Sequence, residues 1–370
     1  MAKVAVLFGG VSPEHDISIL TGLQAQRGLS KTSHEVVSIF WAKNNEFYLI
    51  PNGLEADQFA GGVIRGAEKL SLQLGEDPGF WLTAKRLGRN KKLDLDVVLL
   101  ALHGGPGEDG TIQSILDVAG IRYTGPNARG AALGMDKLAF YGACVSSGLP
   151  ALPRVLLRSD LSDAGMPGPY IVKPRYGGSS IGIDVVQDLT TAKARLNSNV
   201  HFKSGAVLEP YRPDLFDIQI ALRTYPKLEL SAIEKPLRTR SGNEILSYKD
   251  KYVAGAGMAD APRELPAQIP DELAKSVHDA AKVLAATVPL RGVSRIDFLS
   301  DGQSELYVNE VNTIPGSLSK YLFIAPALSF ETLLGDLIGE AMATNTFTPT
   351  TQGADGSALS SAGSIAAKLA

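Results

Sequence analysis

Two short apolar runs in the first third of the chain each end in glycines. Residues 4–8 are rich in β-branched side chains and lead into Gly9-Gly10, and residues 95–102 lead into the sequence HGGPGEDG at 103–110. A run of this kind is typical of a buried strand that ends in a turn, and a helical pattern follows each one. Strands that alternate with helices, with functional loops at the strand ends, predict an open α/β sheet.

The rest of the chain divides by the same kinds of pattern. Further strands are predicted at 34–40 and 47–50, while the glycine-rich stretch 53–79 predicts loops. After 125–126 the pattern changes to strands joined by tight loops, with predicted strands at 170–173, 183–186, 206–209, 217–223, 229–234, 293–299 and 305–311 and helices from 137 toward 148, at 271–286 and at 330–343. We predict an α/β N-terminal domain over 1–125, two α+β units over 126–212 and 213–343, and a mobile tail over 344–370.

Composition excludes several classes of protein. The chain has 370 residues, enough for two or three domains with their own cores. Its net charge of -3 gives no global basic field for nucleic acid. The single cysteine, Cys144, excludes an internal disulfide and a multi-cysteine zinc site. No apolar run approaches the ~20 residues of a membrane helix. We expect a cytoplasmic protein that binds neither nucleic acid nor membrane.

The stretch IVKPRYGGSSIGI at 171–183 has the parts of a phosphate-binding loop. Lys173 ends a predicted strand, and the following glycines and serines supply unhindered N–H groups and two hydroxyls. The loop is neither a P-loop nor a Rossmann fingerprint, because the spacing of its glycines and lysine fits neither motif. The alternative is an ordinary glycine-rich hairpin loop.

A predicted hairpin near the end of the chain gathers oxygen ligands. Arg295 and Asp297 share one face of the first strand, and Glu310 and Asn312 share one face of the second, because strand side chains alternate. A loop over 301–306 places Asp297 opposite Glu310, whereas a two-residue turn would not. Two carboxylates and an amide oxygen suit Mg²⁺ that bridges nucleotide phosphates. The alternative, a surface hairpin with solvated charges, is disfavoured because the neighbouring residues are apolar and buried carboxylates need a cation or donors.

A lysine-bearing glycine loop and a carboxylate-rich hairpin in separate units imply a nucleotide clamped between them. The chain also carries, in order over 4–318, the motifs LFGGVSPEHDIS, ALHGGPGEDGTIQ, YTGPNARGAALGMDK, IVKPRYGGSSIG, VLEPY, SYKDKY, RIDFL and NEVNTIPGS. In these motifs it resembles the D-alanine–D-alanine ligase family of the ATP-grasp superfamily. The resemblance implies an open-sheet pre-ATP-grasp domain followed by a two-part ATP-grasp unit. It also implies an ATP-dependent ligase that joins two D-alanines through an acyl phosphate for peptidoglycan synthesis, and a homodimer.

The resemblance implies a role for each matching residue. For ATP it implies Lys137, Lys173, Gly178, Ser179, Ser180, Glu209, Tyr211, Lys251 and, for the ribose, Asp217 or Asp214. For Mg²⁺ or Mn²⁺ it implies Asp297, Glu310 and Asn312. For the amino acids it implies Glu14 on the first ammonium, His103 in the substrate site, Tyr252 on a closing loop, and Arg295 with the Gly316 N–H as oxyanion donors. Ser179 belongs to both the phosphate loop and the catalytic set.

The chain departs from the family pattern at the second amino acid. The serine that usually binds its carboxylate is replaced by Tyr321, and Lys320 adds a positive charge that suits a carboxylate. The acceptor is therefore D-alanine or, as the alternative, another amino acid or a hydroxy acid. A non-catalytic nucleotide-binding protein is disfavoured because binding alone does not need Arg295. A nicotinamide-dependent oxidoreductase would need a fuller glycine fingerprint after residues 4–8.

Overall fold

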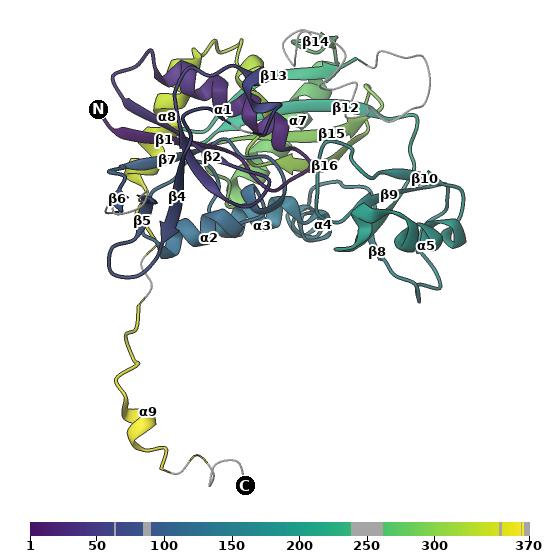
Figure 1. The fold of residues 1–370 in the computed structure, drawn as a ribbon. Helices are drawn as coiled ribbons and strands as arrows, with labels where there is room; N and C mark the ends of the chain where they lie inside the picture. The colour runs from purple at the N-terminus through teal and green to yellow at the C-terminus, as the bar shows by residue number, and fades with distance from the viewer. Residues whose placement is uncertain (63, 84–89, 238–261, 348–349, 364, 366–370) are drawn as a thin grey trace.

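The computed structural model describes the whole chain except residues 63, 84–89, 238–261, 348–349, 364 and 366–370 (Figure 1). Its strands form three sheets that follow one another along the chain. They have seven, four and five strands. The first sheet lies beside the third in the larger body of the molecule, and the second extends from it at one side.

The first sheet combines a parallel centre with an antiparallel extension. β1 (Lys3–Gly9) pairs in parallel with β2 (Glu35–Trp41) and β7 (Val97–Leu100). The extension continues antiparallel through β3 (Phe47–Ile50), β4 (Glu68–Gln73), β5 (Gly79–Leu82) and β6 (Lys91–Lys92). The prediction of loops over 53–79 was therefore wrong for β4. Most β4 side chains are polar and only Leu70 is buried, so pairing with β3 and β5 forms this strand without a strong apolar pattern.

Helices from both ends of the chain cover the first sheet. α1 (His15–Leu29) packs on β1, and α8 (Phe330–Ala343) packs on α1 and β7. Leu333 and Leu337 of α8 therefore share one apolar core with residues of β1 and β7. α2 (Thr111–Val118), α3 (Ala128–Met135) and α4 (Lys137–Ser146) then lead to the second sheet. Asn127 and Asp136 cap α3 and α4 by accepting backbone N–H bonds.

The second sheet has the order β10-β9-β11-β8. Its strands are β8 (Val155–Leu157), β9 (Tyr170–Pro174), β10 (Asp184–Val186) and β11 (Ala206–Pro210). α5 (Leu189–Ser198) packs on this sheet around a small apolar core. The short 3-10 turn η3 (Val200–Phe202) follows α5 and adds Phe202 to that core.

The third sheet has one apolar and one polar face. Its order is β14-β13-β12-β15-β16. The strands are β12 (Phe216–Arg223), β13 (Glu229–Pro236), β14 (Arg263–Glu264), β15 (Val293–Ser300) and β16 (Leu306–Asn312). α7 (Asp271–Thr287) covers the face that carries Ile218, Ile220, Ile296 and Phe298. Because strand side chains alternate, Asp217, Gln219, Arg295 and Asp297 point to the other face.

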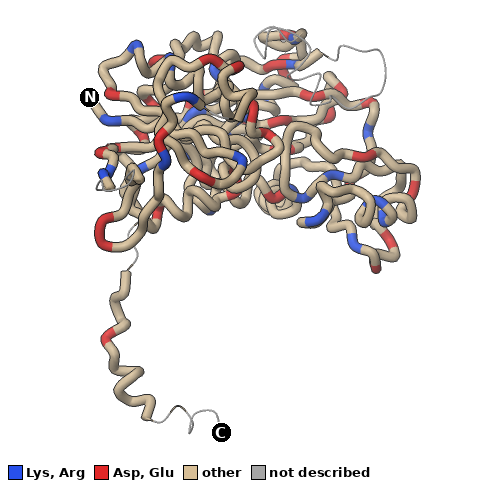
Figure 2. Tube along the Cα trace, in the orientation of Figure 1, with Lys and Arg blue, Asp and Glu red and all other residues tan. Residues whose placement is uncertain are grey.

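The surface and the tail add little to the architecture. Both signs of charge are interspersed along the chain in Figure 2. Among the described residues, the helices are all too short or too polar to cross a membrane. The tail leads away from the body and includes the short helix α9 (Ser357–Ser360) (Figure 1). The 3-10 turns η1 (Ala56–Phe59) and η2 (Gly105–Gly107) lie in the first unit.

The three sheets lie within the segments 1–125, 126–212 and 213–343 that the sequence suggested, while α8 packs on the first sheet. The division into domains stays a prediction.

Candidate active site

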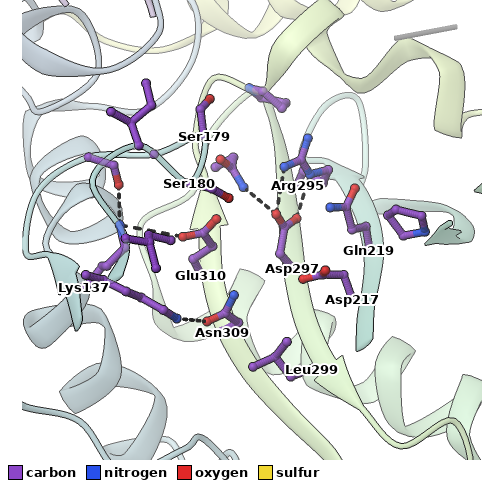
Figure 3. Close-up of a pocket in the computed structure, with 18 of the residues that line it drawn as sticks. Lys137, Ser179, Ser180, Asp217, Gln219, Arg295, Asp297, Leu299, Asn309 and Glu310 are labelled. Atoms are coloured by element: carbon purple, nitrogen blue, oxygen red, sulfur yellow. Dashed lines mark hydrogen bonds and ion pairs between the residues drawn. The ribbon is translucent and has the colours of Figure 1, made fainter. Parts of the chain in front are cut away.

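A cavity of about 220 Å³ lies where the three units meet. The first unit contributes Glu14, His103 and Glu108, and the polar face of the third sheet forms the opposite wall. The residues predicted for ATP, metal and substrate that line it are Glu14, His103, Lys137, Lys173, Gly178, Ser179, Ser180, Glu209, Tyr211, Asp217, Arg295, Asp297, Glu310, Asn312, Gly316 and Tyr321. Figure 3 shows ten residues of this lining by name.

A row of polar side chains crosses the third sheet beneath the cavity. Glu310 pairs with Asp297, Asp297 with Gln219, and Gln219 with Glu234 on successive strands. The predicted pairing of Asp297 with Glu310 is confirmed. Its cause differs from the one predicted, because the hairpin loop covers 301–305 and pairs Ser300 with Leu306.

A β-bulge at Asn309 supplies the missing residue. The register shifts between Asp297 and Phe298, and beyond it Glu310, rather than Asn309, lies opposite Asp297. A bulge sets two residues of one strand against one of its partner and re-aims their side chains. Asn309, Glu310 and Asn312 consequently all line the cavity (Figure 3).

Arg295 and Asp297 form a two-pronged ion pair. Nε of Arg295 lies 2.7 Å from Oδ1 of Asp297, and Nη2 donates to Oδ2 at 2.8 Å. Nδ2 of Asn312 donates to the same Oδ2 at 3.2 Å. These contacts fix the orientation of one carboxylate and one guanidinium in the cavity wall.

The two predicted ATP lysines reach the cavity from α4 and β9. Nζ of Lys137 lies 3.8 Å from Oε2 of Glu310 and donates to the carbonyl oxygen of Gly177 (Figure 3). Burial lowers the pKa of Lys137, and the charge of Glu310 opposes that effect. Nζ of Lys173 donates to Oε2 of Glu209 at 2.9 Å and to Oδ1 of Asn309 at 3.2 Å.

Arg154 links the backbone at Lys137 to the backbone at Asn309, beside the two lysines. Its Nη1 donates to the carbonyl oxygen of Lys137 at 2.7 Å, and its Nη2 to that of Asn309 at 3.1 Å. Nε lies 2.8 Å from Oε1 of Glu209 without the alignment of a hydrogen bond, so that contact is an ion pair. Burial raises the pKa of Glu209, but the charges of Arg154 and Lys173 outweigh burial and hold it below its ordinary value. Glu209 therefore positions Lys173.

The glycine-serine loop lies against the first unit. Ser179 and Ser180 have φ angles of 54° and 58°, a left-handed conformation that is uncommon outside glycine. The Ser179 hydroxyl donates to Glu14. Glu14 itself fits between two glycines, since a Cβ on Gly104 would lie 2.5 Å from Oε2 of Glu14 and one on Gly178 would lie 3.2 Å from it. The loop and Glu14 thus close one end of the cavity together.

His103 and Glu108 hold the segment before Gly316. Nδ1 of His103 lies 2.7 Å from the carbonyl oxygen of Ile314, and Nε2 lies 2.7 Å from Oγ1 of Thr21. Glu108 accepts the N–H of Ile314 at 3.1 Å and that of Gly104 at 2.9 Å. Burial lowers the pKa of His103 to about 4, so the ring is neutral at pH 7. Both ring nitrogens bond to protein groups, so His103 acts on the loop that carries Gly316.

Four residues named from the sequence are not among the described residues that line the cavity, and one of them, Asp214, pairs with Arg212 instead. Lys251 and Tyr252 lie outside the described residues. Lys320 does not line the cavity, and its charge acts on Glu331 of α8. It belongs to the 3-10 turn η4 (Gly316–Leu322), in which neighbouring side chains point about 120° apart, so Tyr321 can face the cavity while Lys320 does not. A role of Lys320 toward the substrate stays a prediction.

Several cavity residues were missed by sequence reasoning. They are Glu108, Gln219, Glu234, Arg263 and Asn309. Arg154, which holds the backbone at Lys137 from outside the lining, was missed as well. Gln219 follows Asp217 by two residues, so alternation along the strand puts both on one face and could have indicated Gln219. Arg154 follows a proline in a connecting segment, and Arg263 belongs to none of the motifs quoted above. No local sequence pattern therefore marks either residue.

The sequence was compared with models of protein families and with known proteins. The model for the D-ala D-ala ligase N-terminus matches residues 3–126, and that for the D-ala D-ala ligase C-terminus matches residues 162–339. The chain belongs to the D-alanine–D-alanine ligase family. A D-alanine–D-alanine ligase of Campylobacter lari is 32% identical over 321 residues, which are 86% of this chain and 88% of that protein.

Solved structures extend the match to the fold. The crystal structure of D-alanine–D-alanine ligase from Helicobacter pylori has a TM-score of 0.71 and 26% identity, and the match covers 94% of this chain and 100% of that one. VanG D-Ala:D-Ser ligase from Enterococcus faecalis, at 24% identity, has the same fold with a TM-score of 0.75 over 92% of this chain and 99% of its own. The chain is thus a ligase with an open-sheet domain followed by a two-part ATP-grasp unit, as the resemblance implied.

Proposed function

We propose that this chain uses ATP and Mg²⁺ in the described cavity to join two D-alanines into a dipeptide for peptidoglycan synthesis. The observation that carries the proposal is the opposition, across one cavity, of two lysines and an acidic pair. Lys137 and Lys173 come from α4 and β9, and Asp297 and Glu310 come from β15 and β16. In a member of this family, that opposition is suited to a nucleotide triphosphate with its cation.

The first half of the reaction activates a carboxylate. A free carboxylate is a poor electrophile, and phosphorylation turns it into an acyl phosphate with a good leaving group. The transferring phosphoryl group spreads negative charge over its oxygens, which calls for nearby cations and donors. Lys137, Lys173 and the N–H groups of the loop 177–180 supply them. Glu14 binds the ammonium of this first amino acid, next to the same loop.

The donor set at Asp297 fits a magnesium ion. Mg²⁺ prefers oxygen ligands and is commonly held by one or two carboxylates together with substrate phosphates. Within the described part of the chain, no three or more acidic, histidine or cysteine side chains group into a metal site of their own. Asp297, Glu310 and the amide of Asn312 would hold the ion, and the phosphates would complete its shell. When bound, the ion neutralises charge on the phosphoryl oxygens.

The second half of the reaction forms the peptide bond. The acceptor attacks the acyl carbon as its neutral amine, so its ammonium first gives up one proton to solvent. The new C–N bond replaces the C–O bond to phosphate, phosphate leaves, and the second proton lost from nitrogen also goes to solvent. The oxyanion that forms on the way needs fixed donors, which Arg295 and the N–H of Gly316 supply. Arg295 stays charged throughout, and its ion pair with Asp297 fixes its orientation. Three consecutive left-handed residues, with φ of 48° to 49° at 317–319, follow Gly316 and set the direction of this backbone.

The remaining expectations concern the nucleotide, the acceptor and the assembly. Tyr211 and Asp217 line the cavity and would contact the base and the ribose. Tyr321 also lines it, so a different acceptor amino acid or a hydroxy acid is the second candidate function. A cytoplasmic location stays a prediction. Homodimerisation stays a prediction.

A phosphate-release screen tests the function. ATP and Mg²⁺ are supplied with pairs of amino acids of both hands, and products are identified by mass spectrometry. We expect phosphate and dipeptide in equal amounts with D-alanine, none with L-alanine, and loss of both on addition of a chelator. Phosphate release without dipeptide, or dipeptide only with another acceptor, would contradict D-alanyl-D-alanine synthesis.

A further inference from the structure

An ion pair that the reaction described above does not use lines the cavity beside Arg295. Glu234 of β13 ends the polar row across the third sheet, two strands from Asp297. Nη1 of Arg263, in β14, lies 2.9 Å from Oε1 of Glu234. The Arg263 guanidinium also lies over the ring of Tyr321, 4.6 Å from its centroid. All three side chains line the cavity.

This pair has the features of a binding site. The side chain of Glu234 is 4% exposed and that of Arg263 is 13% exposed, so both charges are largely removed from water. Oε2 of Glu234 accepts no well-aligned hydrogen bond from the described residues, an uncommon state for a buried carboxylate oxygen, although the Tyr321 hydroxyl lies near enough to Glu234 to act against the rise of its pKa. Burial raises the pKa of Glu234, and the charge of Arg263 opposes that effect. A structural ion pair would be expected to satisfy both oxygens, whereas a ligand with a donor would satisfy Oε2.

The ring of Tyr321 holds the arginine in one place. A guanidinium stacked on an aromatic face gains cation–π attraction, and the stacking fixes its plane. A guanidinium carries five N–H donors in a planar fork, more than a single carboxylate uses, so one arginine can bind two carboxylates. Arg263 is therefore built to receive a carboxylate at a fixed angle.

The position of the pair matches the side on which the acceptor must enter. In the proposed reaction, Asp297, Glu310 and the lysines bind the nucleotide with its cation, and Glu14 binds the first amino acid, so the end of the cavity at Glu234 is left for the acceptor. Neighbouring strands lie about 4.8 Å apart, so Glu234 is about 10 Å across the sheet from Asp297. That distance accommodates an acyl phosphate and one small amino acid.

We propose that Glu234 and Arg263 form the acceptor subsite, which recognises the incoming amino acid as a zwitterion. Its ammonium is bound by Oε2 of Glu234, its carboxylate is bound by Arg263, and Tyr321 fixes the arginine. This inference rests on the proposed function and specifies which part of the cavity receives the second substrate.

Two probes separate the two contacts. D-Alaninamide lacks the carboxylate, so it can act only as an acceptor and cannot use Arg263. D-Lactate has a hydroxyl in place of the ammonium, so it cannot form the charged contact with Glu234 and retains at most a neutral hydrogen bond. Each is offered with ATP, Mg²⁺ and D-alanine, and the mixed products are measured by mass spectrometry alongside D-alanyl-D-alanine.

The variants should respond to matching probes. Arg263→Met should raise the KM of D-alanine as acceptor by about 10- to 100-fold, the scale of a charge-assisted contact, and leave that of D-alaninamide unchanged. Glu234→Gln should raise the same KM and change that of D-lactate much less, because only the ammonium loses a charged contact. The KM for ATP should stay constant in both. Arg263→Lys, which keeps the charge without the planar fork, should be intermediate and serves if Arg263→Met fails to fold.

Arg158→Met is the matched control, because Arg158 is an exposed arginine paired with Asp160 outside the cavity. Equal effects of a cavity variant on D-alanine and on its matching probe, or parallel changes in the KM for ATP, would overturn the subsite. A wild-type enzyme that makes no dipeptide from D-alanine would instead refute the proposed function, so the two failures are distinct.

Discussion

Arg295 and Asp297 hold each other through two contacts of 2.7 and 2.8 Å on one face of β15. The contact joins the residue proposed for the oxyanion to the residue proposed for the cation. A change at either position therefore disturbs the other, and the two roles must be separated by measurements that report on different steps.

Arg295→Lys should slow acyl transfer and preserve nucleotide binding. Lysine keeps the positive charge but lacks the fork that both contacts Asp297 and donates to the oxyanion. Loss of one oxyanion donor typically costs about 10²–10³ in rate. Rapid-quench measurement of a single turnover gives the rate of dipeptide formation, and calorimetry gives ATP affinity. A single-turnover rate equal to that of the wild type would remove Arg295 from the oxyanion site.

Asp297→Asn and Glu310→Gln should each lose most turnover and need more Mg²⁺ for half-maximal activity. Each change removes one negative charge from an oxygen donor set and keeps its shape. Turnover is measured against Mg²⁺ concentration at saturating ATP. Asp279→Asn is the control, because Asp279 is an exposed acid on α7 outside the cavity. A Mg²⁺ dependence like the wild type in both cavity variants would place the ion elsewhere.

The hairpin shows how far the sequence determines the site. Alternation along the strands was enough to put Arg295 and Asp297 on one face. The apolar neighbours correctly indicated that Asp297 is buried, whereas Glu310 is only half-buried. The register itself depends on the bulge, since uninterrupted pairing from Ser300 and Leu306 would have set Asp297 against Asn309. A bulge follows from backbone geometry and from the packing around it, which no alternation of side chains reveals.

Long-range contacts explain the other residues that were missed. Arg154 gains its role from Lys137, Glu209 and Asn309, which come from three separate elements. Arg263 likewise depends on Glu234 and Tyr321. The glycine-serine loop, in contrast, could be predicted from its own residues, because the loop itself needs glycine and serine.

Lys173→Ala should lower both ATP affinity and turnover. The lysine offsets phosphate charge in the proposed complex, and its loss leaves Glu209 paired with Arg154 alone. Calorimetric titration with ATP and steady-state kinetics report the two effects. Lys193→Ala, on α5 and outside the cavity, serves as the control. Unchanged ATP binding together with an unchanged rate would show that the loop beside Lys173 does not bind phosphate.

The stability of the protein should carry a pH dependence from Glu108. Burial, followed by the nearby charge of Glu14, raises the pKa of Glu108 from 4.5 to about 7, against the opposing effect of three hydrogen bonds. A carboxyl whose pKa is raised by folding favours the folded state below its ordinary pKa, and this contribution is lost as the pH rises through the folded value. His103 acts in the opposite sense, since its pKa is lowered to about 4 and its contribution is lost as the pH falls toward that value.

Glu108→Gln isolates the contribution of Glu108, because the variant cannot titrate at this position and His103 is common to both proteins. The free energy of unfolding is measured by urea titration, without nucleotide or metal, from pH 4.5 to above pH 7, the window set by the two pKa values of Glu108. We expect the stability of the wild type relative to the variant to fall steadily across that window. Glu14→Gln should lower the folded-state pKa of Glu108, because it removes a charge that raises this pKa together with burial. The pH window over which the stability falls should then be narrower. A stability difference that is constant with pH would show that Glu108 does not change its protonation between the folded and unfolded states.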